Sequence, residues 1–509
     1  MITMIHLHKA FILGSTISLL TGCIGALVRI ESDGTGLLRV HPSNPVYFTD
    51  NSGRAIYLGG HQIFVDLQDN TFGNYTTYNQ QAQLDWPWYL QFAKARNLNY
   101  LRNWTLTSTG CGVPLQCAVA YPMPYKRISG SGSANDGGAK FDLNQFDEEF
   151  FSRLRSRVID AANNGMYVSI MLYDVYAFSN YSAPLSPMWG GNVFNAANNI
   201  NGITADTNGD GWGVEFFTAP SSEIRRLQKN YVVKVIDTVN DLDNVIFEIG
   251  NEVGALQWQY EMINFVKTYE ASKAKQHLVL MSPGGLSGLN IYTSATQSEV
   301  IGSAADIYAA SIDWADYLDN PPANNNGKPG ILDRDHVRPT NTLAPMLPWQ
   351  AFARGYHYSL YDQPFEAHSI EDATWELARY NIGAVVRYAN SIFSDLSKMV
   401  PSGDLSSTQY ALANQGSEYL IVQPGSGAFT VEMQAGVYNY EWFDPNTAST
   451  TEKGLVNAEA GNNVFTPPFN GSAVLYLKSA PQSGLVSLRG SDSSVSSVDE
   501  QDRGRTPER

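Results

Sequence analysis

Two groups of acidic residues are best suited to chemistry, because each lies at the end of a short apolar run. Asn251 and Glu252 close one run, and Asp333 and Asp335 lie at the end of another. Hydrolysis of a glycosidic bond requires one carboxylic acid that protonates the leaving oxygen and a second carboxylate that attacks the sugar or activates water. We therefore predict that Glu252 is the general acid/base and that Asp333 or Asp335 is the second carboxylate.

The second carboxylate belongs to the sequence Asp333-Arg-Asp-His336. In a strand, Asp333 and Asp335 point to the same side, with Arg334 and His336 beside them. Both basic side chains are able to hold an ionised aspartate, and His336 is also a predicted substrate contact. A structural ion pair at a strand end is the alternative interpretation, and the spacing leaves open which aspartate acts.

Several other polar and aromatic residues at or near the ends of apolar runs are predicted to contact substrate. These residues are His61, Arg102, Trp104, Asp174, Asn251 and Trp258. Taken alone, each is more often a residue of the core or of its rim than a catalytic group. Glu248 lies four residues before Glu252 and is expected to be a buried, paired structural carboxylate.

The elements that must position these residues are short apolar runs that alternate with amphipathic segments. The predicted strands are residues 55–64, 99–106, 166–174, 244–252, 277–285, 306–311, 328–336 and 356–365, and the predicted helices include residues 146–164, 222–240, 258–275 and 372–393. Ser221 is the expected N-cap of the second helix. Eight strands with intervening helices predict a (β/α)8 TIM barrel, in which catalytic groups lie at the C-terminal ends of the strands. An open doubly wound sheet is the alternative, but no glycine-rich phosphate loop follows the first strand.

The sequence changes character after about residue 401. Apolar residues there alternate at period two between turns rich in glycine and asparagine, which predicts a small antiparallel β-sandwich. Residues 479–509 are rich in serine, glycine and charge and are predicted to be disordered. The expected domains are therefore the barrel at residues 38–400 and the sandwich at residues 401–478.

The N-terminal region resembles a bacterial lipoprotein leader. Lys9 precedes an apolar run over residues 10–20, followed by Leu20-Thr-Gly-Cys23. This run is too short to cross a bilayer and suits the core of a signal peptide. We predict a signal peptide at residues 1–22, lipidation of Cys23, and export to the bacterial cell envelope. A plain signal peptide with a chance cysteine, and hence secretion, is the alternative.

Composition narrows the classes of partner. The chain has 43% hydrophobic, 16% charged and 12% aromatic residues, and rings are well suited to stacking on sugars. A formal net charge of −16 argues against a nucleic-acid partner. The expected partner is a carbohydrate, with membrane contact only through the lipid at Cys23.

Cysteine and motif counts give no reason to expect a metal or an organic cofactor. Cys111 and Cys117 predict a small disulfide in an exported protein, with two free thiols as the alternative. Residues 206–211 match the first half of a calcium loop, but Phe217 stands where an EF-hand requires glutamate. An Asn/Asp/Gly turn is the preferred interpretation of residues 206–211.

The ordered motifs resemble the apiosidase-like and cellulase-like barrel hydrolases of the DUF4038 type, within clan A of the retaining glycosidases. The resemblance is carried by residues 41–61, 140–144, 198–202, 244–252 and 333–336. Residues 443–447 and 465–477 resemble the C-terminal sandwich attached to such barrels, which is often labelled collagen-binding. Together these segments extend the resemblance over about residues 38–478.

By this resemblance, Glu252 is the acid/base and Asp333 takes the place of the seventh-strand nucleophile. The clan uses glutamate there, so the shorter aspartate leaves open whether the two carboxylates stand about 5–5.5 Å apart, as retention requires. Val337-Arg338 also replaces the Trp-Gly of related chains, and Glu366 is a reserve candidate. The leading hypothesis is therefore a glycoside hydrolase acting on a polysaccharide or oligosaccharide. The alternative is a carbohydrate-binding surface lipoprotein whose barrel has lost its chemistry.

Overall fold

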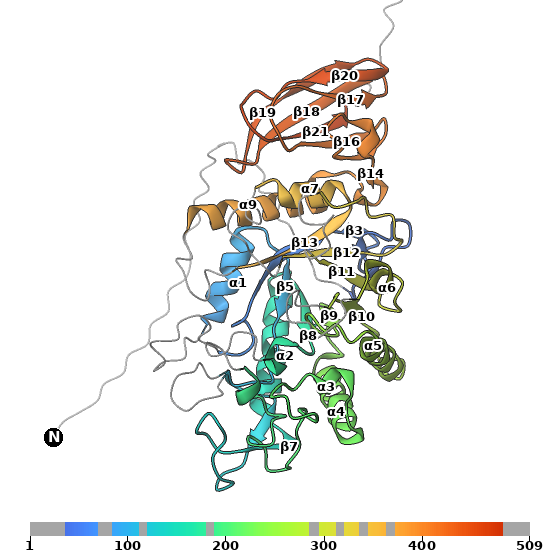
Figure 1. Ribbon diagram of the computed structural model, residues 1–509. Coiled ribbons are helices and arrows are strands. Elements are labelled where there is room, and N and C mark those ends of the chain that lie inside the picture. Colours follow the sequence, from blue (N-terminus) through green and yellow to red (C-terminus); the bar gives the residue numbers. More distant parts are fainter. Residues whose placement is uncertain are drawn as a thin grey trace, which may run out of the picture. The chain divides into compact units, whose positions relative to one another are not determined.

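The computed structural model describes residues 36–69, 84–110, 120–179, 188–284, 295–311, 320–334, 345–362 and 372–481 (Figure 1). Several predictions concern residues outside these ranges: the signal peptide, Cys23, Cys111, Cys117, Asp335, His336, Glu366 and nearly all of the C-terminal tail. Those predictions remain as they were.

Eight parallel strands close into a barrel. They are β4 (Gly59–Ile63), β5 (Tyr100–Asn103), β8 (Tyr167–Met171), β9 (Val245–Glu248), β10 (Leu278–Met281), β11 (Ile307–Ser311), β12 (Gly330–Arg334) and β13 (Tyr356–Tyr361). The barrel closes where β13 pairs with β4. Each of the eight predicted runs contains one of these strands, so the predicted (β/α)8 barrel is confirmed.

The first predicted run, residues 55–64, holds two strands rather than one. Its first part is β3 (Ala55–Ile56), which pairs with β2 (Phe48–Thr49), which in turn pairs with β1 (Arg39–Val40). Side chains from this small sheet pack on residues that begin the barrel strands, including Tyr100 and Leu278. The sheet therefore covers the N-terminal end of the barrel, and the C-terminal end is left for a site.

Helices surround the barrel (Figure 1). They are α1 (Trp86–Ala95), α2 (Glu148–Asn163), α3 (Glu215–Thr218), α4 (Ser222–Val239), α5 (Leu256–Glu270), α6 (Gln297–Ile301), α7 (Leu347–Ala353) and α9 (Ala373–Arg387). The predicted helices correspond to α2, α4, α5 and α9, and the Ser221 hydroxyl caps α4 by accepting from the N–H of Ile224 at 3.2 Å. A hairpin of β6 (Tyr125–Arg127) and β7 (Phe141–Phe146) precedes α2.

The C-terminal part forms two antiparallel sheets, as the period-two pattern predicts. One has six strands in the order β14 (Val400–Pro401), β15 (Ala411–Asn414), β16 (Glu418–Gln423), β21 (Ala473–Ser479), β18 (Gly436–Asp444) and β19 (Ser449–Ala458). The other pairs β17 (Phe429–Met433) with β20 (Gly461–Phe465). The alternating runs that predict the sandwich begin at Tyr419, Phe429, Tyr438 and Ala473 and correspond to β16, β17, β18 and β21, whereas β14, β15, β19 and β20 were not predicted.

The six-stranded sheet buries both faces. Ile421 and Leu475 belong to the core shared with β17 and β20, whereas Leu420 and Val474 belong to a core shared with α7 and α9. Alternation along a strand sends neighbouring side chains to opposite faces, which explains the two cores. The sheet is therefore packed against the last helices of the barrel through a hydrophobic core.

Trp349 of α7 is expected to be a main support of that shared core. Its side chain is fully buried, its ring packs on those of Tyr388 and Phe443, and its N–H donates to Asn381 Oδ1 at 2.8 Å. Trp349→Ala should lower the free energy of unfolding by about 3–5 kcal/mol, measured by urea denaturation followed by circular dichroism. Leu455→Ala, at a side chain 65% exposed, is the control and should stay within about 0.5 kcal/mol. A loss below about 1 kcal/mol for Trp349→Ala would contradict this role.

None of the helices in the described ranges is both long enough and apolar enough to cross a membrane.

Candidate active site

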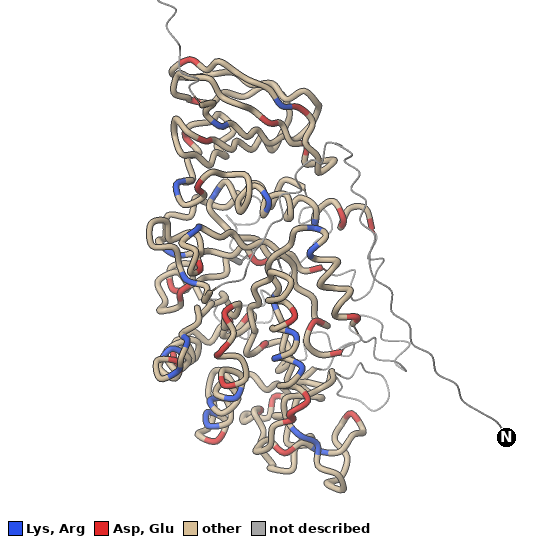
Figure 2. Tube along the Cα trace, turned by 180° about the vertical axis from the view of Figure 1, so that it is seen from behind, with Lys and Arg blue, Asp and Glu red and all other residues tan. Residues whose placement is uncertain are grey.

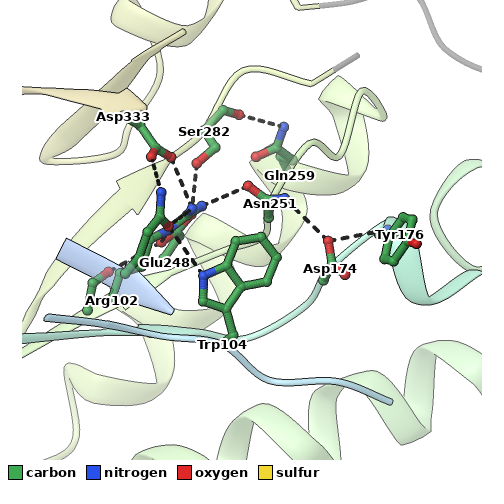
Figure 3. A network of polar contacts seen from close by, with 11 residues as sticks. Arg102, Trp104, Asp174, Tyr176, Glu248, Asn251, Gln259, Ser282 and Asp333 are labelled. Atoms are coloured by element: carbon green, nitrogen blue, oxygen red, sulfur yellow. Dashed lines mark hydrogen bonds and ion pairs between the residues drawn. The ribbon is translucent and has the colours of Figure 1, made fainter. Parts of the chain in front are cut away.

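Arg102 of β5 lies at the centre of a polar network inside the barrel (Figure 3). Its Nε donates to Glu248 Oε2 at 2.7 Å, and its Nη2 pairs with the other oxygen of the same carboxylate. Its Nη1 lies 3.1 Å from Asp333 Oδ2, and its Nη2 donates to Asn251 Oδ1 at 2.8 Å. One guanidinium therefore connects the ends of three strands, β5, β9 and β12.

Asp333 lies at the end of β12 with both carboxylate oxygens in contact with donors. Oδ2 pairs with Arg102, and Oδ1 accepts from Gln62 Nε2 at 2.7 Å. Gln62 is itself fixed, because its Oε1 accepts from Arg102 Nη1 and from Trp104 Nε1. A cation and an amide thus stabilise a negative charge on Asp333 and fix its orientation.

Glu248 is the buried, paired structural carboxylate that was predicted. It is fully buried and, besides Arg102, accepts from Ser282 Oγ at 2.8 Å and from Ser169 Oγ at 3.4 Å. Buried charges are tolerated when they are paired and hydrogen-bonded in this way. Glu248 therefore has the surroundings of a support for Arg102 rather than of a group that exchanges protons with substrate.

Asn251 and Glu252 extend β9 beyond its last regular residue. Asn251 forms a parallel bridge with Asp174, and Glu252 forms one with Gly284. Both carboxylate candidates thus follow or end a barrel strand at the C-terminal end, as predicted. Glu252 has a φ of +53°, and non-glycine residues held in this left-handed region occur preferentially at functional sites.

Asp174 follows β8 and contacts the same network. Its Oδ1 accepts from the N–H of Tyr176 at 3.2 Å and from Asn251 Nδ2 at 3.3 Å. Burial raises the pKa of Asp174 to about 7, because these hydrogen bonds only partly offset the loss of hydration. Asn251 is therefore oriented from both sides, by Arg102 at its oxygen and by Asp174 at its nitrogen.

The raised pKa of Asp174 gives a pH-dependent stability. Between pH values of about 4 and 7 this carboxyl is protonated to a greater extent in the folded protein than in the unfolded chain, so its contribution to the free energy of unfolding falls as pH rises through this window. Asp174→Asn removes this dependence, so its stability relative to wild type should increase from pH 4.5 to pH 7 and then stay constant. Urea midpoints at several pH values measure the difference.

Asp66→Asn provides a parallel test, because burial raises the pKa of Asp66 to about 7 as well. Asp66 accepts from Asn103 Nδ2 at 2.7 Å. If the stability difference between Asp174→Asn and wild type does not change with pH, burial does not raise the pKa of Asp174.

Two predicted substrate contacts, His61 and Trp258, are wrong. His61 is fully buried, pairs through Nδ1 with Asp362 Oδ2 at 3.0 Å and stacks on Tyr89 of α1. Strand alternation explains this, because Gln62 points into the barrel and its neighbour must point outward to the helices. Trp258 lies in the core, with its N–H donating to Gln228 Oε1 at 3.2 Å.

The remaining predicted contacts that lie in the described ranges are close together. Trp104, Arg102, Asn251 and Asp174 all take part in the network, and each is at most 3% exposed. Gln62, a polar residue at the same strand end as His61, belongs to the network as well, because alternation along β4 points it into the barrel. Ser169 and Ser282 had no distinguishing signal in the sequence.

Residues 206–211 form the predicted turn. Asp206 accepts from the N–H groups of Gly209 at 2.7 Å and Gly211 at 3.0 Å. Within the described ranges, no three His, Cys, Asp or Glu side chains are grouped so that they could hold a metal ion.

Among protein families, the model described as a domain of unknown function (DUF6298) matches residues 117–301. This segment includes β8, β9 and Glu252. No curated protein matches the chain.

Solved structures resemble the chain over most of its length. A provisionally assigned glycoside hydrolase of Bacteroides vulgatus ATCC 8482 has a TM-score of 0.57 and 14% identity, covering 88% of this chain and 83% of that one. A glycoside hydrolase of family 5 from the same organism has a TM-score of 0.52 and 12% identity, covering 87% and 94%. A further protein named glycoside hydrolase has a TM-score of 0.53 and 11% identity, covering 87% and 97%. The chain therefore shares its (β/α)8-barrel fold with proteins named as glycoside hydrolases.

Proposed function

We propose that this chain is a glycoside hydrolase that cleaves O-glycosidic bonds of a polysaccharide or oligosaccharide. Glu252 is the general acid/base, and Asp333 or Asp335 is the second carboxylate. The observation that supports this most is the position of Arg102, which contacts both Asp333 and Asn251, the neighbour of Glu252. A pair of carboxyl groups across the C-terminal end of a barrel is what glycosidic cleavage requires.

In the proposed reaction, the carboxyl group of Glu252 transfers its proton to the glycosidic oxygen as the C–O bond breaks. The positive charge that develops on the sugar is balanced by the second carboxylate. If the second carboxylate attacks the anomeric carbon, a covalent glycosyl ester forms. Water activated by Glu252 then releases the sugar, and the anomeric configuration is retained. If the second carboxylate instead removes a proton from the attacking water, the anomeric configuration is inverted.

Of the two aspartates, Asp333 is the one that lies in the described ranges. Its contacts with Arg102 and Gln62 hold it ionised and oriented, which both reaction courses need. Asn251 is oriented so that its Nδ2, which donates to Asp174, retains a second N–H. We assign that N–H to a sugar hydroxyl.

The test is a screen of polysaccharides, oligosaccharides and aryl glycosides for released sugar. Proton NMR of the first product formed from a substrate that is cleaved then shows its anomeric configuration. Turnover of at least one glycoside supports the proposal, and the anomer decides between retention and inversion. Binding of sugars without turnover of any of them would instead favour the carbohydrate-binding lipoprotein.

We further propose export through the leader at residues 1–22, with a lipid on Cys23 and a disulfide between Cys111 and Cys117. Support comes from Leu20-Thr-Gly-Cys23 and from the cysteine spacing. Incorporation of labelled palmitate into wild type, but not into Cys23→Ala, tests the anchor. Kinship with the DUF4038-type barrels and a collagen-binding label for the C-terminal sheets rest on motif resemblance alone.

A further inference from the structure

Glu252 has a backbone conformation that requires support from its neighbours. A glutamate with a φ of +53° is held at a cost of order 1–3 kcal/mol, which persists only where the surrounding structure fixes it. The carboxyl group of an acid catalyst must also stay within a fraction of an ångström of its working position. The contacts around residues 250–254 are therefore part of the proposed chemistry.

Backbone packing supports the segment on one side. Glu252 bridges to Gly284, and the next residues pass so close to it that a Cβ on Gly284 would lie 2.1 Å from the Cα of Gly254. No side chain other than hydrogen fits such a contact. The end of β10 and the segment after Glu252 are therefore in direct backbone contact.

Gln259 supports the segment from the other side. It lies in the first turn of α5, is fully buried, and donates through Nε2 to the carbonyls of Val253 and Ser282, the latter at 3.2 Å (Figure 3). A primary amide carries two N–H donors, so both are used, one on each strand extension. Gln259 thus connects Val253, the residue after Glu252, with Ser282, the residue after β10.

Through Ser282, the hydrogen bonds of Gln259 are also connected to the network around Arg102. The hydroxyl of Ser282 donates to Glu248, which holds the guanidinium that contacts Asp333. The same guanidinium binds Asn251, the residue before Glu252. The segment that carries Glu252 is therefore held just before Glu252 by Arg102 and just after it by Gln259.

We propose that Gln259 is a positioning residue that fixes the conformation of Glu252. It does not touch the reacting atoms and acts through the carbonyl of Val253. Its effect on turnover rests on the proposed function, whereas its effect on the segment itself does not.

The chain offers a closely matched control in Asn244. Its Nδ2 donates to the carbonyls of Val158 and Met166, both at 3.0 Å, and it directly precedes β9. In the described structure neither Asn244 Oδ1 nor Gln259 Oε1 has a hydrogen-bond partner. Replacement by leucine thus removes two amide-to-carbonyl bonds in each case, just before the start of β9 for Asn244 and beyond the ends of β9 and β10 for Gln259.

The experiment compares Gln259→Leu and Asn244→Leu in the full chain by three measurements. These are the thermal midpoint, kcat and KM on the best substrate from the screen, and hydrogen exchange of a peptide covering residues 249–255. Gln259→Met, which keeps a straight side chain without donors, replaces Gln259→Leu if the latter does not fold.

We expect both variants to lose stability, but only Gln259→Leu to lower kcat, by about 10- to 100-fold with KM within about 2-fold. Only that variant should also speed exchange of the N–H groups of Ile249 and Asn251, which are bonded to Leu280 O and Tyr173 O. Equal losses of kcat in both variants, or unchanged exchange in Gln259→Leu, would overturn the proposal. If wild type cleaves no glycoside but exchange still separates the variants, the proposed function fails and the role of Gln259 stands.

Discussion

Glu252→Gln is expected to lower kcat on a natural glycoside by about 10²- to 10⁴-fold. Glutamine keeps the size of the side chain and its place beside Asn251, but it has no proton to give to the glycosidic oxygen. The loss should be much smaller on aryl glycosides with acidic phenols, because these leaving groups depart without protonation. The dependence of kcat on leaving-group pKa therefore measures the role of Glu252 directly.

Two further measurements sharpen this prediction. A general acid must be protonated, so the alkaline limb of the pH profile of kcat/KM should be lost in Glu252→Gln. Glu223→Gln, on the surface of α4 and paired with Arg226, is the control and should leave kcat unchanged. If Glu252→Gln retains wild-type turnover on all substrates, the acid is another residue.

Arg102→Met is expected to lower the free energy of unfolding by about 3–5 kcal/mol, the usual cost of leaving a buried charge without its partner. Glu248 is fully buried and would lose the guanidinium that pairs with both of its oxygens, while Asp333 would lose its contact with Arg102 and keep the one with Gln62. Turnover should also be lost, because Asn251 and Asp333 are both oriented by this guanidinium. Urea denaturation measures the free energy of unfolding, and kcat on a substrate found in the screen measures turnover.

The double variant Arg102→Met/Glu248→Met separates charge from packing. Removing both partners should recover part of the stability lost by Arg102→Met alone, with a coupling of about 1–3 kcal/mol. Its turnover should not recover, since Asp333 and Asn251 remain without Arg102. Additive losses in the double variant would show that the two side chains do not stabilise each other as a pair.

The sequence alone determined which segments form the barrel, because burial on both faces of parallel strands leaves continuous apolar runs. Each of the eight runs contains a barrel strand, and Ser221 marks the start of α4 as its hydroxyl predicts. The place of Asn251 and Glu252, a few residues beyond the end of β9, followed from the same pattern. Each of these features depends on a short stretch of sequence, so the periodicity of that stretch is sufficient to predict it.

Some helices and strands were not predicted. One of them, α1, has a clear start signal in the sequence, whereas another, β19, has no such signal. α1 begins at Trp86, with Asp85 as its N-cap and Pro87 in its first turn, a readable start signal. β19, by contrast, is an edge strand whose residues are mostly exposed, so it lacks the apolar alternation that identifies a strand.

Only the tertiary structure decided which way the site residues face and what they contact. His61 and Gln62 are neighbours with similar polarity, and a shift of one residue in the strand exchanges the inward and outward side chains. Gln62 and Asp333 are separated by 271 residues in sequence and meet only because the barrel closes where β13 pairs with β4. Likewise, the left-handed conformation of Glu252 depends on Gly284 and Gln259, which lie on other elements. Composition and periodicity thus placed the carboxylates at strand ends, whereas barrel closure fixed their partners, since those contacts join residues far apart in the chain.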